Sequence, residues 1–338
     1  MKKTGNTYCF QDPPRVLAYA SVVGKKEGEG PLSRDFDYIS DDNTFGEQTW
    51  EKAESRMMSM ALERALSKAH LPPSQLGCIL GGDLLNQCIG TTFALRPTNV
   101  PFLGRYGACS TMAEGLLVAS CLVESGFEQT ACAITSSHFC SAERQYRYPL
   151  EYGGQRPQTA QWTATASGAV VLQKGGMGVR ITHATPGRIA DPGVTSQANM
   201  GAAMALSAYE TISRFFQDTH TGPSHYELIV TGDLGKVGHQ IVIDLFQRDG
   251  IDMRPTYDDC GLLLYDGSQD VHAGGSGCGC SAAVLCSYIL KAMEQGIFRK
   301  VLFCGTGALL SPTSCNQGQS IPGICHLICL EADEKWNM

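Results

Sequence analysis

The sequence lacks long apolar runs and has no excess of basic residues. No window approaches the roughly eighteen consecutive apolar residues that a membrane-spanning helix needs, so no segment is expected to cross a bilayer. Residues 1–13 also lack the apolar core of a signal peptide, which predicts that the chain is not exported. The formal net charge of -7 argues against nucleic acid as a partner.

Charged residues are also scarce, and the cysteines show no paired C-x-x-C motif. Only 17% of the 338 residues are charged and 43% are hydrophobic, so the chain can bury a large core and is not expected to be disordered. The 15 cysteines are unevenly spaced and mostly lie in apolar runs, which favours free core thiols in a reducing compartment. Cys278-Gly279-Cys280 is interpreted as packing rather than as a metal motif. No cofactor and no metal ligand are predicted.

Hydrophobic periodicity and glycine or proline breaks predict alternating strands and helices. The first half is expected to contain strands at residues 15–24, 76–83, 130–137 and 163–172, and helices at residues 47–69 and 109–125. The second half is expected to contain strands at residues 179–184, 226–234, 300–305 and 323–330, and helices at residues 198–217, 236–247 and 278–295.

The two halves resemble each other. Gly126-Phe127 ends one helix before a strand, as Gly296-Ile297 does later, and Gly82-Asp83 matches Gly232-Asp233. This self-similarity predicts a duplicated α/β unit, with halves at residues 1–175 and 176–338 that pack about a pseudo-twofold axis. The alternative is two unrelated α/β domains.

Cys109 lies where an extended segment turns into a helix. Small residues around it allow a tight bend, and the unpaired N–H groups of the first helical turn would point at its thiol. The positive end of the helix would lower the pKa of the cysteine, preparing a nucleophile or an anion site that includes Ser110. The alternative is a packed, inert cysteine.

A glycine-rich turn precedes the matching helix of the second half. It runs from Asp270 through His272 to Gly277 and exposes backbone N–H groups, which would form an anion cradle at Gly274 and Gly275. Because both central helices of a duplicated unit would begin in one crevice, His272 is expected near Cys109. The pair would form an activated nucleophile, unless His272 is a surface or capping residue.

Residues 138–161 form an unusually long segment between two predicted strands. Arg144, Arg147 and Arg156 lie there among tyrosines. The segment is interpreted either as a contact to an anionic ligand or as an arm of a dimer interface.

These motifs carry a family resemblance over nearly the whole chain. The Tyr-Gly-Ala-Cys109-Ser turn, the His272-Ala-Gly-Gly-Ser-Gly turn and the Cys304-Gly-Thr-Gly strand end resemble the thiolase and ketoacyl synthase superfamily. Together with Ala-Glu-Arg144-Gln-Tyr-Arg147-Tyr-Pro and Val-Thr-Gly-Asp233-Leu-Gly-Lys, they more closely resemble the stage V sporulation AD family of endospore-forming bacteria. The resemblance implies a thiolase-like fold, a five-layer αβαβα sandwich of two α/β halves.

The resemblance also implies a function. The family is implied to bind dipicolinate (pyridine-2,6-dicarboxylate) for its uptake into the forespore and its release in germination. The implied protein is a homodimer, made in the forespore cytoplasm and held at the spore inner membrane by membrane proteins of the same operon.

The chain departs from working acyl-transfer enzymes of the superfamily at one electrostatic position. Those enzymes carry an Asn or a second His where this chain has Asp233, and an anionic Asp would oppose a developing oxyanion. A non-catalytic binding protein is therefore favoured, with ligand contacts predicted at Cys109, Ser110, His272, Gly274, Gly275, Asp233, Arg144 and Arg147. The alternatives are an acyltransferase with Cys109 as nucleophile and His272 as base, and a structural scaffold.

The role of the two aspartates is left open. Asp83 and Asp233 do not suit a bare dianion. They would help if dipicolinate arrives as a calcium chelate, or they cap backbone groups.

Overall fold

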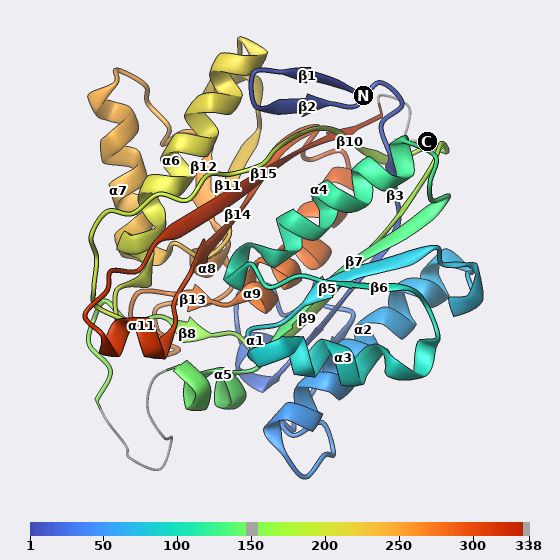
Figure 1. Ribbon diagram of the computed structural model, residues 1–338, viewed down its shortest axis with the longest axis horizontal. Helices are drawn as coiled ribbons and strands as arrows, with labels where there is room; N and C mark the ends of the chain where they lie inside the picture. Colours follow the sequence, from blue (N-terminus) through green and yellow to red (C-terminus); the bar gives the residue numbers. More distant parts are fainter. Residues whose placement is uncertain (147–154, 334–338) are drawn as a thin grey trace.

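The computed structural model describes residues 1–146 and 155–333 (Figure 1). Two mixed sheets are joined edge to edge into one strand path, β12-β11-β14-β15-β10-β3-β9-β7-β5-β6. Only the pair Arg15 and Arg180 links β3 to β10. The two sheets therefore meet along a short seam.

The first sheet has strand order β3-β9-β7-β5-β6. Its strands are β3 (Arg15–Val23), β9 (Ala166–Gln173), β7 (Thr130–Ser137), β5 (Cys78–Gly82) and β6 (Phe102–Gly104). The pairs β3–β9 and β9–β7 are antiparallel, whereas β7–β5 and β5–β6 are parallel.

The second sheet repeats this arrangement strand for strand. Its order is β10 (Val179–Thr185), β15 (Gly323–Ala332), β14 (Lys300–Ala308), β11 (Leu228–Thr231) and β12 (Tyr257–Asp259). The first two pairs are again antiparallel and the last two parallel. This repeat confirms the duplicated α/β fold expected from the sequence.

Helices form three layers around the two sheets (Figure 1). One outer layer packs on the first sheet, a central layer lies between the sheets, and the other outer layer packs on the second sheet. The outer layer on the first sheet consists of α2 (Trp50–Ala69) and α3 (Ile89–Leu95). The central layer consists of α4 (Thr111–Glu124) and α9 (Cys278–Val284). The outer layer on the second sheet consists of α6 (Met200–Thr219) and α7 (Gly235–Arg248). The fold is thus the five-layer αβαβα sandwich that the resemblance implied.

Shorter elements complete the described chain. The strands are β1 (Lys2–Thr4), β2 (Thr7–Cys9), β4 (Tyr38–Ile39), β8 (Trp162–Thr163) and β13 (Gly275–Ser276). The helices are α1 (Lys25–Gly28), α5 (Phe139–Tyr146), α8 (Cys260–Leu263), α10 (Leu290–Glu294) and α11 (Pro312–Asn316). Within the described residues, no helix is long and apolar enough to cross a membrane.

Helix α2 shows how local sequence sets an element. The Thr49 side chain accepts a hydrogen bond from the Lys52 N–H at 3.4 Å, which caps the first turn. The chain leaves the helix at His70, whose φ of 54° is left-handed. One apolar face of the helix is buried on the first sheet, through Ala53, Met57, Met58, Ala61, Leu62, Ala65 and Leu66.

The helix predicted at residues 278–295 is not continuous. It consists of α9, a π-helical turn (Leu285–Ile289) and α10. Its first part, α9, packs tightly on β9. A Cβ added to Gly168 on β9 would lie only 2.6 Å from the Ala282 carbonyl oxygen. Only glycine at this position permits the helix to approach so closely.

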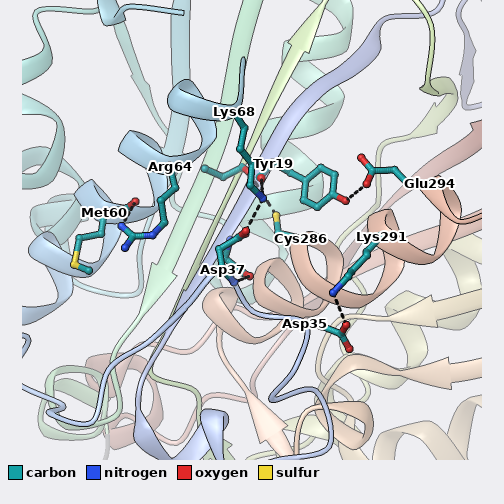
Figure 2. A network of polar contacts seen from close by, with 11 residues as sticks. Tyr19, Asp35, Asp37, Met60, Arg64, Lys68, Cys286, Lys291 and Glu294 are labelled. Carbon is teal, nitrogen blue, oxygen red and sulfur yellow. Dashed lines mark hydrogen bonds and ion pairs between the residues drawn. The ribbon is translucent and has the colours of Figure 1, made fainter. Parts of the chain in front are cut away.

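Polar contacts tie the first half to the second beside the central layer (Figure 2). The Tyr19 hydroxyl on β3 donates to Glu294 on α10 at 2.7 Å. Lys68 on α2 pairs with Asp37 at 2.5 Å and donates to the Tyr19 carbonyl at 2.9 Å. Burial raises the pKa of Tyr19, and the bond to Glu294 raises it further, so the phenol remains a proton donor.

Candidate functional site

Cys109 lies at the tight turn that the sequence predicted, at the start of the first central helix. It belongs to a 3₁₀ turn (Ala108–Ser110) that continues directly into α4. Ala108 has a φ of 51°, a left-handed conformation that costs free energy for a residue with a Cβ. The turn directs Cys109 to a cavity of about 210 Å³ between the two halves.

The cavity is lined mainly by apolar and hydroxyl-bearing side chains. Tyr146 donates a hydrogen bond to the Leu84 carbonyl, and its hydroxyl lies 2.7 Å from that of Tyr106. Glu143 also lines the cavity and accepts a hydrogen bond from Thr163 at 3.1 Å. The other lining residues are Ala108, Cys109, Ala142, Met200, Ser276, Ala308, Leu309 and Leu310.

The sequence predicted a lowered pKa for the Cys109 thiol, and the surroundings of the residue have the opposite effect. Burial raises the pKa of Cys109 well above its ordinary value, and the neighbouring Asp233, which accepts a hydrogen bond from the thiol, raises it further. A negative carboxylate and a low-dielectric environment both disfavour the thiolate. The expected stabilisation by the positive end of the helix does not prevail, and Cys109 is a neutral thiol.

Asp233 fills the anion-binding position at the start of the second central helix. One carboxylate oxygen accepts from the Gly277 N–H at 2.9 Å and from the Ser276 hydroxyl at 3.0 Å. The other accepts from the Thr306 hydroxyl at 2.8 Å. The N-terminus of α9 is therefore satisfied by a carboxylate of the protein itself.

The glycine turn before α9 is also bonded within the protein. The Gly274 N–H donates to the Val271 carbonyl at 3.1 Å, and its own carbonyl accepts from the Trp162 N–H at 2.8 Å. Gly275 belongs to β13, which pairs with β8. Gly274 and Gly275 do not line the cavity, and their role as ligand contacts stays a prediction.

His272 does not line the Cys109 cavity. Its φ is 53°, and its ring lies 2.9 Å from the Pro157 carbonyl through Nδ1 and 3.1 Å from Asp270 through Nε2. These contacts hold the imidazole against Pro157 and Asp270. Asp233, rather than an imidazole, accepts the hydrogen bond of the Cys109 thiol, so the structure does not show the Cys–His pair that the sequence predicted.

The other predicted contacts are scattered. Arg144 forms an ion pair with Glu51 and does not line the cavity, whereas Arg156 bonds to the Asp270 carbonyl at 2.6 Å. Ser110 is buried and donates to the Gly107 carbonyl at 2.7 Å. Arg147 lies outside the described residues.

Asp83 is the counterpart of Asp233 in the first half and caps backbone groups in the same manner. It accepts from the Leu85 N–H at 2.8 Å, the Thr91 N–H at 2.7 Å and the Thr91 hydroxyl at 2.6 Å. Of the two roles left open by the sequence, capping is the one that the geometry shows for both aspartates.

The sequence reasoning missed most of the cavity wall. Tyr106 stands three residues before Cys109 and could have been found as a neighbour of the thiol at the same turn. Tyr146 belongs to the segment at residues 138–161 that the sequence offered as a ligand contact, whereas Met200 and Leu310 come from distant segments and their residue types carry no signal of a binding site.

Comparison with solved structures supports the fold. The chain is similar to 3-oxoacyl-[acyl-carrier-protein] synthase III from Aquifex aeolicus VF5, with a TM-score of 0.55 and 13% identity over 94% of this chain and 99% of that one. It is also similar to cerulenin-bound OleA from Xanthomonas campestris, with a TM-score of 0.62 and 14% identity over 98% of this chain and 100% of that one. At these identities the likeness shows a condensing-enzyme fold alone.

Sequence comparison is more specific. A curated relative from Bacillus subtilis (strain 168), stage V sporulation protein AD, is 45% identical over 332 residues, which cover 98% of each chain. The profile of the stage V sporulation protein AD (SpoVAD) family matches residues 4–331. The chain therefore belongs to the SpoVAD family of sporulation proteins, built on a thiolase-like fold.

Proposed function

We propose that this sporulation protein is a non-catalytic binding protein for dipicolinate, acting in its uptake into the forespore and its release in germination. The observation that carries the proposal is the state of Cys109: a neutral thiol faces a small cavity and is bonded to a carboxylate instead of an imidazole. A nucleophilic cysteine needs a lowered pKa, whereas burial and the neighbouring Asp233 carboxylate raise the pKa of this thiol. The cavity suits binding better than acyl transfer.

The size and lining of the cavity suit one small planar ring. Its volume of about 210 Å³ is below the roughly 300–1,000 Å³ of pockets for drug-sized ligands. Tyr106 and Tyr146 offer aromatic faces and hydroxyls, and Leu309 and Leu310 add apolar surface. A pyridine ring would pack on these groups, with its carboxylates directed to hydroxyls.

The lining of the cavity favours dipicolinate bound as its calcium chelate. Among the described lining residues there is no Arg, Lys or His. A free dianion would lose its hydration without meeting a cation in that lining, whereas a one-to-one calcium chelate has no net charge. The chelate therefore enters such a site at the lower electrostatic cost.

The assembly and location of the protein complete the proposal. We propose a homodimer that is held at the spore inner membrane by membrane proteins of the same operon. The open edge strand β6 supports dimerisation, because Leu103 on it is 43% exposed. Light scattering after size-exclusion chromatography tests this part, and a purely monomeric protein contradicts it.

Calorimetric titration with dipicolinate, with and without equimolar calcium, tests the function. Binding is expected to be tighter with calcium and to weaken at least about tenfold in Leu310→Trp, which fills the cavity, and in Tyr146→Phe. His272→Ala and Cys121→Ala serve as controls outside the cavity. Absence of binding by the native protein refutes the function, whereas binding that is unchanged in Leu310→Trp refutes the cavity.

An acyltransferase is the second candidate, because Cys109 lines the cavity at a helix start within a condensing-enzyme fold. This candidate predicts stoichiometric acylation of Cys109 by an acyl-CoA. Intact-mass measurement over a panel of acyl-CoA thioesters decides, and an absence of any adduct removes it.

A further inference from the structure

A second group of reactive side chains lies far from Cys109, in a row across three strands of the second sheet. His183 on β10 is the direct partner of Cys9 on β2 and of Cys329 on β15. Directly paired residues of neighbouring strands project from the same face of a sheet. The row therefore presents two thiols with an imidazole between them.

Two further features direct this row to one point. Glu331 follows Cys329 by two residues on β15, so its carboxylate projects from the same face. The register of β10 against β15 shifts between Ile181 and His183, which leaves Thr182 as an extra residue in a β-bulge. Bulges redirect side chains and are frequent at functional sites. The Thr182 hydroxyl contacts His183 at 3.0 Å and Glu331 at 3.2 Å.

The row opens into a cavity rather than into packed core. Cys9, His183, Cys329 and Glu331 all line a cavity of about 250 Å³, which Phe215 of α6 also lines. The ligating atoms of His183, Cys329 and Glu331 lie within 4.8 Å of one another. In a tetrahedral zinc site, bonds of about 2.0–2.3 Å separate the ligand atoms by roughly 3.3–3.8 Å, so small side-chain rotations suffice.

We propose that His183, Cys329, Glu331 and Cys9 bind one Zn²⁺ ion. Two sulfurs, one imidazole nitrogen and one carboxylate oxygen are the mixed donor set that zinc prefers, and they exclude Mg²⁺ and Ca²⁺, which take oxygen ligands. His183 would bind through Nε2, because its Nδ1 faces the Thr182 hydroxyl. Cys9 lines the same cavity but contacts the Thr4 hydroxyl at 3.8 Å, so its thiol would have to turn toward the other three residues to supply the fourth ligand.

The basic residues around the site hold the carboxylate in place. Arg180 pairs with one Glu331 oxygen at 3.2 Å, while the other oxygen accepts from Thr182. Lys300 is the β14 partner of Glu331 and lines the same cavity. Zinc would bind the oxygen on the Thr182 side, with Arg180 as the outer partner of the carboxylate.

The ion would fasten the N-terminal hairpin to the second sheet. Cys9 ends the β1–β2 hairpin, whose other side is held by Asp218 of α6, which accepts from the Asn6 N–H and the Thr7 hydroxyl at 2.8 Å. Zinc would add a bond from this hairpin to β10 and β15. The role is structural and separate from the Cys109 cavity, so it is independent of the proposed dipicolinate binding.

Metal titration of the full chain tests the site. The reduced protein is stripped with a chelator and titrated with Zn²⁺ against a chromogenic chelator, and with Co²⁺ as a spectroscopic probe. One ion per chain is expected, with a thiolate-to-cobalt charge-transfer band and tetrahedral visible bands. His183→Asn and Cys329→Ser are expected to weaken zinc binding at least about 100-fold, beyond the roughly 10–100-fold cost of losing an outer-shell partner.

Cys121→Ser is the matched control, because Cys121 is a half-buried thiol of α4 outside the cluster. It is expected to keep the ion and the cobalt spectrum. Circular dichroism checks the fold of each variant. If Cys329→Ser fails to fold, His183→Asn decides the test, because His183 is only half-buried. Equal zinc affinity in the native protein and His183→Asn, or no stoichiometric zinc in the native protein, overturns the proposal.

Discussion

Glu54 tests whether a buried carboxyl group stays protonated in the core of this protein. The side chain is 1% exposed on α2 and accepts hydrogen bonds from Ser136 at 3.0 Å and Ser141 at 2.7 Å. Burial raises the pKa of Glu54 from its ordinary 4.5 to about 8, and the negative charge of nearby Asp83 adds to the effect. We therefore expect the folded protein to hold this carboxyl protonated at neutral pH.

The sign of the pH dependence follows from this raised pKa. Above about pH 4.5 the unfolded chain releases the proton while the folded chain keeps it, so the stabilisation present at low pH is lost as pH rises toward about 8. The difference corresponds to roughly 5 kcal/mol in total, of which about 3 kcal/mol falls between about pH 5 and pH 7.5. Glu54→Gln keeps the shape and stays neutral, so it removes this loss.

Urea denaturation of native protein and Glu54→Gln across that pH range measures the effect. The free energy of unfolding of the variant, relative to that of the native protein, is expected to increase by about 3 kcal/mol as pH rises over this range. Glu63→Gln is the control, because Glu63 lies on the same helix with a 62% exposed side chain. Its free energy of unfolding should differ from that of the native protein by the same amount at every pH. If the stability curves of Glu54→Gln and the native protein run parallel, the protonated buried carboxyl is refuted.

Three further changes test other parts of the structure. Tyr19→Phe leaves Glu294 without its donor and should cost about 1–3 kcal/mol of unfolding free energy; an equal loss in Glu294→Met, which removes the acceptor, would show that the bond is responsible. Asp233→Asn should lower the pKa of Cys109 and speed its alkylation by iodoacetamide at neutral pH, and a slower reaction would contradict this electrostatic assignment. Gly168→Ala should cost about 1–3 kcal/mol by forcing α9 off β9, as read by the thermal midpoint, whereas Gly267→Ala, where nothing lies within 4 Å and the backbone is not left-handed, should leave the midpoint nearly unchanged.

The order of elements could be predicted from the sequence because it depends on local patterns. The predicted strand at residues 15–24 is β3, and the predicted helix at residues 47–69 is α2. Glycines such as Gly126 and Gly296 end equivalent helices in the two halves, and this match indicated the duplication. The π-helical turn within the second central helix could not be predicted, because it depends on packing against neighbours.

The site was harder to predict than the fold. Cys109 was found because a cysteine at a strand-to-helix turn is a local signal. The position of His272 depends on its left-handed backbone and on the Pro157 carbonyl, neither of which has a sequence signature. His183 and Cys329 are far apart in the chain and meet only through the antiparallel pairing of β10 with β15.

The central layer has a consequence for the history of the molecule. Helix α4 belongs to the first half but contacts β5 and β7 on one side and β14 and β15 on the other. If the gene is cut between its two copies, this helix is left with one apolar side facing water. A single ancestral unit would have met the same difficulty, and pairing with a second copy of itself would have covered that side before the genes were fused.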